Sequence, residues 1–424
     1  MGVSKNSSCL EALRAVVGDG AFALEPARVV AGGRLVTEVA PKNAEELSAC
    51  LRALTAEGEA VLVEGAGTQM NYGNPVEGAA TLLSCRHLSG VVEFDSADGV
   101  IQAGAGTPLR ELAKVVATEG WLLPLDPPDR GGSLGGTLAT AVSGPRERGL
   151  GPVRDAVLGL DTVLASGDRA RCGARVVKNV TGYDMAKLYV GSLGTLGVIE
   201  KAWLRLKPVP ASCRVVELEV PRTEGAFELA LAAARRGSAR GVGLRAGDAN
   251  SLEGPGGSLR LVAEFAGEAP ATEADAGWLL RGRTACAPAE GGMDAVRDLQ
   301  GRPLPGGLRA RVHVLPLRLA EAWQCLEGPG VELLAYPEPA VLHARFVPRS
   351  DGAEDFVWLD EVLGRLDAMR HSLGAEVVID ELPEAAPGDH DVFWGAANLG
   401  LMRALKDRFD PSRILNPGRF AGRI

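Results

Sequence analysis

The residues of this sequence whose types and spacing could do chemistry are glycines, gathered in short clusters beside apolar segments. Glycine supplies 55 of the 424 residues, nearly twice its average share of about 7%. The first cluster, Gly65-Ala66-Gly67-Thr68-Gln69, follows an apolar run that begins at Ala60. Because glycine has no Cβ, the backbone here can turn sharply and point successive N–H groups into a concavity that holds phosphate oxygens.

Two further clusters of this kind follow. Gly132-Ser133-Leu134-Gly135-Gly136-Thr137 precedes an apolar stretch that can open a helix, whose first N–H groups favour an anion. The third cluster, 191–199, contains Gly197 and Val198. The first cluster is not the fingerprint G-x-G-x-x-G, because Met70 stands at its last position, and no P-loop sequence occurs. Three cradles without a P-loop favour an extended diphosphate cofactor over a mononucleotide, although each could also be an ordinary glycine turn.

Cysteine and histidine give no sign of a metal or redox centre. The seven cysteines stand singly, and the five histidines include no H-x-x-H or H-x-H pair. An iron–sulfur cluster, a dithiol motif and a metal site are therefore not expected in this chain.

Charge and hydropathy exclude other classes of function. With 45 Lys and Arg against 54 Asp and Glu, the formal net charge is −9, and no basic run is present, so nucleic acid is not expected as a partner. No apolar stretch approaches the roughly 18 residues of a spanning helix. The start lacks a secretory pattern, and Asn6 stands where a myristoylation signal needs Ser or Thr. A cytoplasmic protein is expected.

The elements that must hold the first two clusters alternate in type along the chain. Asn43 and Glu46 have the spacing of a capping box, which predicts a helix after them. Thr107 as N-cap and Pro108 as the first helical residue predict a second helix, which ends at Gly120. Apolar and alternating runs predict a strand at 60–65, a hairpin of 91–94 with 98–104, and a strand and turn at 157–168.

The second half of the chain, residues 211–400, has the alternation of an α+β layer. Strand-like and helix-like pieces lie at 214–220, 226–236, 259–265, 309–316, 342–348, 353–371 and 375–380, before a final helix at 396–409. Loops or linkers are predicted for the Gly/Pro/Ala-rich stretches 246–258, 266–275 and 285–307.

Taken in order, these motifs resemble a known family. They are the cluster at 64–69, P-L-D…G-G-S-L-G-G-T at 124–137, S-G-P-R at 143–146, V-L-G-L-D-T-V-L-A-S-G-D at 157–168, V-K-N-V-T-G-Y-D at 177–184, G-S-L-G-T-L-G-V-I at 191–199, and F-D-P…I-L-N-P-G-R at 409–419. The set is similar to the FAD-linked oxidases of the vanillyl-alcohol-oxidase, or PCMH-type, class. Within them it most resembles the FAD-binding subunit of glycolate oxidase.

The resemblance implies an α+β fold, with a two-lobed PCMH-type FAD-binding domain followed by a smaller α+β cap domain. The expected boundaries are an N-terminal segment 1–38, the FAD-binding domain 39–210, the cap domain 211–395, and a C-terminal segment 396–424 that returns to the FAD-binding domain.

The resemblance also assigns residues to the cofactor. Gly65 to Gln69 would form the pyrophosphate loop, and Gly132 to Thr137 with Ser143 and Gly144 would contact the diphosphate and the flavin. Gly197 and Val198 would hydrogen-bond FAD through backbone groups. Some members attach FAD through a His in the first glycine loop. This loop has none, so non-covalent FAD is expected.

Other residues of the motifs have open roles. Lys178, Asn179, Tyr183 and Asp184 are interpreted mainly as scaffold, and Asn416 with Pro417 either closes the last helix or lies at the flavin edge. The cap stretch 335–346 lacks the carboxylate–histidine cluster of members that oxidise 2-hydroxy acids themselves. There, His343 is interpreted as a packed or surface histidine rather than a base. Arg345 is interpreted as solvent-facing, with clamping of a carboxylate as the alternative.

Three functions follow as hypotheses, and in each of them the catalytic residues are unknown. The first is the FAD-binding subunit of a multi-subunit 2-hydroxy-acid (glycolate or lactate) oxidase or dehydrogenase. Its partners would be a catalytic FAD-linked oxidase subunit and an iron–sulfur subunit, through which it could contact a membrane. The second is a self-sufficient FAD-dependent oxidase with Arg345 or Asn416 near the flavin. The third is an assembly subunit whose FAD is structural or absent.

Overall fold

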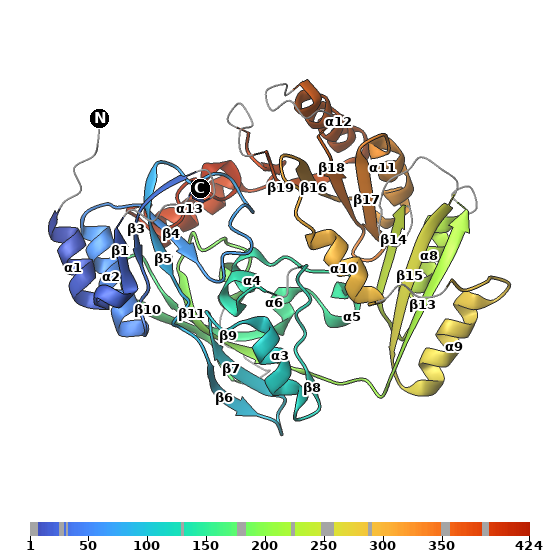
Figure 1. Ribbon diagram of the computed structural model, residues 1–424, viewed down its shortest axis with the longest axis horizontal. Helices are drawn as coiled ribbons and strands as arrows, with labels where there is room; N and C mark the ends of the chain where they lie inside the picture. The colour runs from blue at the N-terminus through green and yellow to red at the C-terminus, as the bar shows by residue number, and fades with distance from the viewer. Residues whose placement is uncertain are drawn as a thin grey trace.

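The computed structural model describes residues 7–24, 29–30, 33–128, 131–175, 184–221, 225–246, 258–286, 291–348, 357–383 and 390–424. Figure 1 shows a first part with two sheets, coloured blue to green, and a second part around one larger sheet, coloured lime to red. Helix α13 returns from the second part to lie beside the first. The α+β fold class is confirmed.

The first sheet has the order β1 (Phe22–Leu24), β3 (Gly33–Val39), β5 (Ala79–Ser84), β4 (Val61–Glu64), with β2 (Val29–Val30) also paired to β3. Strands β3, β5 and β4 are parallel. Helices α1 (Ser7–Val17) and α2 (Ala44–Ala56) share a core with this sheet, in which Leu13, Leu47 and Val61 are buried. Since β1 and most of β3 lie before residue 39, we propose that the expected N-terminal segment belongs to the first part.

The second sheet is antiparallel throughout, with the order β10 (Arg169–Gly173), β9 (Val157–Val163), β11 (Val198–Arg205), β7 (Val100–Gly104), β6 (Val91–Asp95). Strands β6 and β7 form the expected hairpin. The remaining elements of this part are α3 (Leu109–Ala117), α4 (Leu134–Thr140), α5 (Glu147–Leu150), α6 (Val153–Ala156), α7 (Ala186–Tyr189), and the ribbon of β8 (Trp121–Leu122) with β12 (Lys207–Pro208). Leu112, Leu134 and Leu138 from α3 and α4 are buried in one core with the sheet.

The second part, called the cap below, is built on an eight-stranded antiparallel sheet. Its order is β13 (Ser212–Pro221), β15 (Ser258–Gly267), β14 (Ala239–Ala246), β17 (Val331–Tyr336), β18 (Val341–Phe346), β16 (Leu308–His313), β19 (Glu376–Glu381), β20 (Phe393–Trp394). Residues alternate between its two faces, as strand geometry requires. On β18, Leu342 and Ala344 lie in the apolar core, while His343 and Arg345 point to the opposite face.

Helices cover the two faces of the cap sheet unequally. The apolar face shares its core with α8 (Ala226–Ala234), α9 (Ala269–Leu280), α11 (Leu319–Leu326) and α12 (Val357–Leu373). The other face carries α10 (Met293–Gly301), whose Val296 packs with Tyr336 and Val262. Figure 1 shows α10 between the cap sheet and the first part. The polar face of the cap is therefore the one that meets the first part.

Local sequence signals explain where helices begin. Asn43 Oδ1 accepts a hydrogen bond from the Glu46 N–H at 2.8 Å, so the expected cap of α2 is confirmed. The expected cap of α3 is wrong. Pro108 is the N-cap, and the Thr107 hydroxyl instead donates to the Gly104 carbonyl at 2.7 Å. The same hydroxyl accepts from the Gly90 N–H at 2.9 Å, which ties the start of α3 to the hairpin.

Two stretches expected to be loops contain helices. Helix α9 occupies much of 266–275, and α10 lies within 285–307. Alanine has the highest helix propensity and proline is tolerated in a first turn, so the segment that begins Ala269-Pro270 is a good helix once Leu279 can be buried. Most of the stretch 246–258 lies outside the described residues.

The C-terminal segment joins the first sheet. After α13 (Leu399–Phe409) the chain runs beside β4, where the Val61 N–H donates to the Ile414 carbonyl and the Asn416 N–H to the Val61 carbonyl, both at 2.7 Å. The short 3₁₀ helices η1 (Asp19–Ala21), η2 (Pro316–Arg318) and η3 (Ala421–Arg423) complete the elements. Among the described residues, no helix has the length and apolar character needed to cross a bilayer.

Candidate functional site

The first two glycine clusters meet around one cavity. The first cluster contributes Gly65 to Gln69, and the second contributes Gly132, Ser133, Gly136 and Thr137. The turn 191–197 contributes Leu193, and the C-terminal segment contributes Asn416 and Arg419. Segments far apart in the sequence therefore form one wall.

An adjoining cavity brings in the third cluster. Gly135, Gly197 and Val198 line it. It shares six lining residues with the first cavity, namely Val63, Gly65, Gly136, Ala139, Leu193 and Asn416. The two cavities are called the hollow below, and all three clusters meet along it.

The glycines of the first cluster are needed for close approach and for turning. A Cβ on Gly65 would lie 2.0 Å from Ser133 Oγ. Any residue other than glycine at position 65 would therefore push the two clusters apart. Gly67 has φ +78°, and a Cβ would lie 2.8 Å from Glu64 Oε1.

Ser133 joins the first cluster to the helix that follows the second. Its Oγ accepts from the Ala66 N–H at 3.2 Å and from the Gly136 N–H at 3.3 Å, so it caps α4 and fixes the loop at once. The helix expected after Gly135 is confirmed, since α4 spans 134–140. Thr140 adds a second link, because its hydroxyl donates to Gln69 Oε1 at 2.7 Å.

Asn416 fastens the third cluster to β4. Its Oδ1 accepts from the Val63 N–H at 2.8 Å, and its Nδ2 donates to the Leu193 carbonyl at 2.5 Å. A Cβ on Gly194 would lie 2.7 Å from that Nδ2, so only glycine leaves room for the Asn416 side chain at this position. These side-chain contacts are with β4 and the third cluster rather than with the last helix, and Asn416 lines the hollow, so its place at the flavin edge stays a prediction.

A buried ion pair positions the segment that carries Asn416. Lys406 Nζ donates to Asp410 Oδ2 at 2.7 Å, to the Thr195 carbonyl at 2.9 Å and to the Leu415 carbonyl at 2.7 Å. The side chains of Lys406 and Asp410 are almost completely buried. Burial lowers the pKa of Lys406, and the Asp410 charge opposes that shift. Three backbone segments are thus held by one ammonium group.

The hollow is bordered on the cap side by Tyr72. Its hydroxyl accepts a hydrogen bond from Arg311 of β16, whose guanidinium lies 5.0 Å from the centre of the Tyr72 ring. Arg311 Nε also donates to Asp380 Oδ1 at 2.8 Å. Burial raises the pKa of Asp380, and Arg311 and Arg309 oppose that shift. The ring of Phe393 meets Tyr72 edge-on at 6.3 Å.

Arg419 borders the hollow beside Tyr72. Nη2 of the guanidinium donates to the Tyr72 carbonyl at 2.6 Å. Nη1 has no hydrogen-bond partner in the part of the chain that the structure describes. Burial lowers the pKa of Arg419 to about 10.

Ser143 and Gly144, expected at the cofactor, are not among the residues that line the hollow. They lie where the first part meets α10. The Ser143 carbonyl accepts from Gln300 Nε2 at 3.0 Å, and a Cβ on Gly144 would lie 2.3 Å from the Asp126 carbonyl oxygen.

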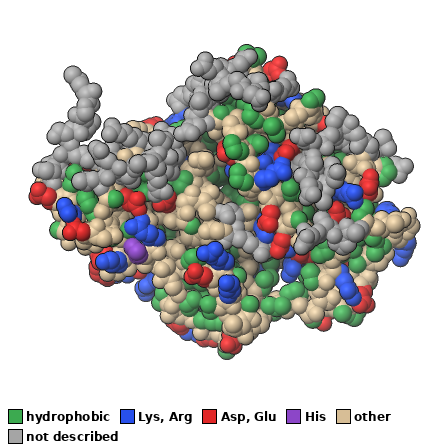
Figure 2. Space-filling view, viewed as in Figure 1, with side chains coloured by type: hydrophobic (Ala, Val, Ile, Leu, Met, Phe, Trp, Pro, Cys, Tyr) green, Lys and Arg blue, Asp and Glu red, His purple; other side chains and the backbone are tan. Residues whose placement is uncertain are grey.

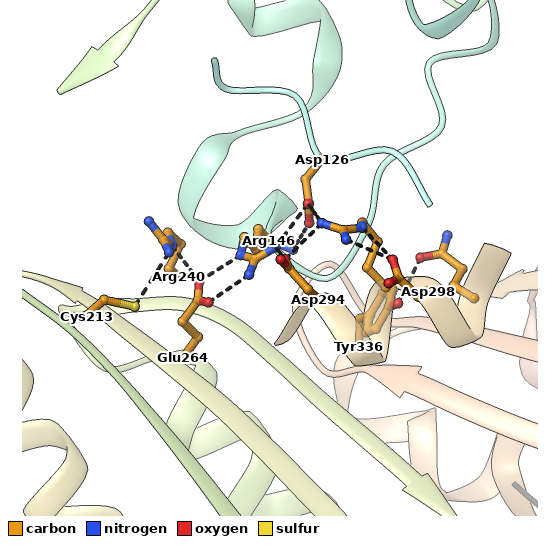
Figure 3. A network of polar contacts seen from close by, with 10 residues as sticks. Asp126, Arg146, Cys213, Arg240, Glu264, Asp294, Asp298 and Tyr336 are labelled. Carbon is orange, nitrogen blue, oxygen red and sulfur yellow. Dashed lines mark hydrogen bonds and ion pairs between the residues drawn. The ribbon is translucent and has the colours of Figure 1, made fainter. Parts of the chain in front are cut away.

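Arg146, two residues further on, leads a network of ion pairs (Figure 3). Its guanidinium donates to both oxygens of Glu264 on β15, and its Nη1 reaches Asp126 at 3.1 Å and Asp294 at 2.7 Å. Arg297 of α10 bonds the same Asp126 at 3.2 Å. This network, called the docking network below, joins the two parts of the molecule.

Other expected site residues lie away from the hollow or outside the described residues. Leu134 is buried in the apolar core under α4. Lys178, Asn179 and Tyr183 lie outside the described residues, while Asp184 forms an exposed ion pair with Lys187 at 3.3 Å.

The interpretation of Arg345 as solvent-facing is wrong. Its side chain is buried, with Nε donating to Glu332 Oε2 at 2.7 Å and Nη2 to the Pro303 carbonyl at 3.3 Å. These bonds also occupy the donors that would clamp a carboxylate. His343 is packed, as expected, with its ring 4.9 Å from that of Tyr336. Burial, followed by the Arg311 charge, lowers its pKa well below the usual value.

The sequence did not predict Tyr72 and Arg419, which line the hollow, or Arg311, which contacts Tyr72. Tyr72 stands three residues after the first cluster, and Arg419 ends the quoted motif I-L-N-P-G-R. Both therefore had a signal in their position. Arg311 had none, since alternation along β16 says only which face it occupies.

The hollow has the features that a long dinucleotide needs. Glycine lining lets a diphosphate approach the backbone closely, and added Cβ atoms at Gly65 or Gly67 would fill or distort the loop. Figure 2 shows this face of the molecule hollowed between the cap and the first part, with charged side chains of both signs at its edge. The residues present fit FAD.

Comparisons with known proteins agree with this fit. Residues 37–173 match the FAD binding domain family, and 391–420 match the C-terminal domain of FAD linked oxidases. The chain is 28% identical over 415 residues, 91% of each chain, to a D-lactate dehydrogenase of Archaeoglobus fulgidus. It is 34% identical over 172 residues to the glycolate oxidase subunit GlcE of Escherichia coli, which is 40% of this chain and 49% of that one.

Among solved structures, the fold resembles that of p-cresol methylhydroxylase with a TM-score of 0.75. The similarity covers 99% of this chain and 97% of that one at 15% identity, so it concerns the fold.

Proposed function

Because the chain belongs to the FAD-linked oxidases, we propose that it is the FAD-binding subunit of a multi-subunit 2-hydroxy-acid oxidase or dehydrogenase. Its relatives include a D-lactate dehydrogenase, a D-2-hydroxyglutarate dehydrogenase and a glycolate oxidase subunit. Glycolate and lactate are the proposed substrates of the complex, and a partner subunit receives the electrons.

The residues of the hollow would hold FAD without a covalent bond. The loop 65–69 and the start of α4 cradle the diphosphate, while Gly197 and Val198 supply backbone groups from the far side. Bound FAD supplies a hydride acceptor that can release electrons singly or in pairs. The chain itself binds the cofactor, orients it with glycine-lined walls, and closes the cap side with Tyr72.

The observation that carries the subunit proposal is the pairing of charges on the cap face. Oxidation of a 2-hydroxy acid calls for a cation for the carboxylate and a base for the hydroxyl proton. Here Arg345 is paired with Glu332 and Arg311 with Asp380, and His343 is buried against Tyr336. These pairings favour oxidation of the substrate on a catalytic FAD-linked partner.

Electron transfer to an iron–sulfur partner is part of this proposal, and the spacing of the cysteines supports it. The seven cysteines stand singly, whereas a cluster needs several thiolates at close spacing. The similarity to GlcE, which is named as a subunit of glycolate oxidase, supports a partner subunit.

A second candidate is a self-sufficient dehydrogenase. The D-lactate dehydrogenase matched along 91% of both chains favours it, as does the contact of Arg311 with Tyr72, which lines the hollow. In that case Arg311 would exchange Asp380 for the carboxylate of the substrate.

Purification of the isolated chain and of the tagged chain from its native host tests these candidates. For the subunit, we expect acid-releasable FAD that glycolate and D-lactate do not bleach in the isolated chain, but do bleach in a co-purified complex. Steady turnover of either acid by the isolated chain with a dye acceptor would contradict the proposal. Flavin that stays oxidised even in the complex would instead indicate a structural FAD.

A further inference from the structure

Arg419 carries a buried positive charge at the wall of the hollow. Its side chain is 5% exposed, and it lines the cavity with Tyr72 and Asn416. One terminal nitrogen, Nη2, is used by the Tyr72 carbonyl, and the other, Nη1, has no partner among the described residues.

The backbone around Arg419 is fixed, so this placement is specific. The Asn74 N–H donates to the Arg419 carbonyl at 2.9 Å. Gly73, with φ +96°, packs closely against the Arg419 carbonyl. A Cβ on Gly73 would lie 2.8 Å from that carbonyl oxygen, so a larger residue would not fit there. The side chain is therefore held at the hollow by its own main chain.

Burial of an unpaired charge costs free energy, which the fold avoids at comparable positions. The buried Lys406 pairs with Asp410, and Arg345 pairs with Glu332, each at 2.7 Å. Arg419 has no such carboxylate partner among the described residues. Its pKa of about 10 is still above neutral pH, so the guanidinium stays charged.

We propose that Arg419 is a cofactor-binding residue whose Nη1 donates to an oxygen acceptor of FAD bound in the hollow. This inference rests on FAD binding there and adds a residue outside the glycine clusters. A guanidinium favours negatively charged oxygens. FAD offers such acceptors on its diphosphate and, when it is reduced, on its ring carbonyls.

The test compares FAD affinity and thermal stability of the full-length wild type with those of R419Q. The control variant is R408Q, which removes the same charge from an exposed position on α13. FAD is removed from each protein, circular dichroism confirms folding, and FAD is titrated back while its fluorescence is followed.

We expect R419Q to bind FAD about 10- to 100-fold more weakly, the usual effect of losing a hydrogen bond to a charged group. R408Q should bind within twofold of the wild type. The FAD-free R419Q protein should melt at or above the temperature of the FAD-free wild type, because an unpaired buried charge is gone.

Wild-type FAD affinity in R419Q overturns the proposal. So does a lower melting temperature of the FAD-free variant, since Arg419 would then support the fold. If R419Q cannot be purified, R419M keeps the apolar stem, and the same two measurements decide. A wild-type protein that binds no FAD would refute the cofactor site itself, which is a separate failure.

Titration with ADP and with riboflavin separates the two sources of the acceptor. Weaker ADP binding in R419Q places the acceptor on the diphosphate, whereas weaker riboflavin binding places it on the ring. Unchanged binding of all three ligands counts against the proposal.

Discussion

At the scale of single residues, the shape of the hollow depends on glycines, which have no Cβ atom. Gly65, Gly67 and Gly135 each stand where a Cβ would approach another heavy atom to within 2.8 Å. For Gly135 that atom is the Ala105 Cβ at 2.7 Å, and its N–H donates to the Ala105 carbonyl at the same distance. The clusters therefore fix how closely α4 and the first loop approach each other.

Gly67→Val should abolish retention of FAD. Gly67 has φ +78°, and the new side chain would press on Glu64 while straining the loop. The measurement is the flavin absorbance of the purified protein relative to its protein absorbance. Gly120→Val is the matched control, because Gly120 has φ +75° but open space around it. It carries the same backbone strain, about 1–2 kcal/mol, away from the hollow. Equal flavin content in the two variants would remove the first cluster from the cofactor site.

At the scale of elements, the strand β16 brings a titratable residue to the polar face of the cap. His313 lies there beside Arg311, and burial, followed by the Arg311 charge, lowers its pKa from 6.5 to about 4. The unfolded chain therefore takes up a proton below pH 6.5 that the folded protein does not take up until about pH 4. The folded state should lose stability as the pH falls through this window.

His313→Gln should reduce this acid sensitivity. Over the window from pH 6.5 to 4, the wild type should lose about 1–3 kcal/mol more unfolding free energy than the variant, since each pKa unit corresponds to about 1.4 kcal/mol and the side chain is partly exposed. Urea denaturation at a series of pH values measures this difference. His371→Gln, at an exposed position on α12, should behave like the wild type. Identical slopes for wild type and His313→Gln would show that His313 titrates alike in both states.

The elements also show which features could be predicted from the sequence. The cap of α2 and the β6–β7 hairpin were predictable because residues within a few positions determine them, as Asn43 and Glu46 do. Helix α9 was missed because its alanines and Pro270 resemble a linker until Leu279 finds the core of the cap. The glycine clusters could be recognised in the sequence, and they line the hollow, while their role as phosphate cradles stays a prediction. For Arg419 the only signal was its place at the end of I-L-N-P-G-R, and its contact with Tyr72 could not be predicted because that contact spans 347 residues.

At the scale of the whole molecule, the cap and the first part are joined by charge. The docking network places Arg146 and Asp126 of the first part against Glu264, Asp294 and Arg297 of the cap. Burial acts to raise the pKa of Glu264, but hydrogen bonds from Arg146 and Arg240 outweigh it and lower that pKa. Because Ser143 and Gly144 lie only two or three residues before Arg146, the motif S-G-P-R lies at the boundary between the two parts, and the hollow lies beside that boundary.

Arg146→Met should loosen the cap from the first part. Without the guanidinium, the buried carboxylates of Glu264 and Asp126 would lose a positive partner. Removing one partner of a buried ion pair costs about 3–5 kcal/mol of unfolding free energy. Calorimetry should show a lower melting temperature, with the single transition broadened or split as the two parts unfold separately.

Arg148→Met is the matched control, because Arg148 pairs with Glu338 of the cap at 2.6 Å while about a third exposed. Such a pair contributes less than about 1 kcal/mol, so a similar small shift in both variants would mean that packing of α10, rather than the docking network, holds the two parts together.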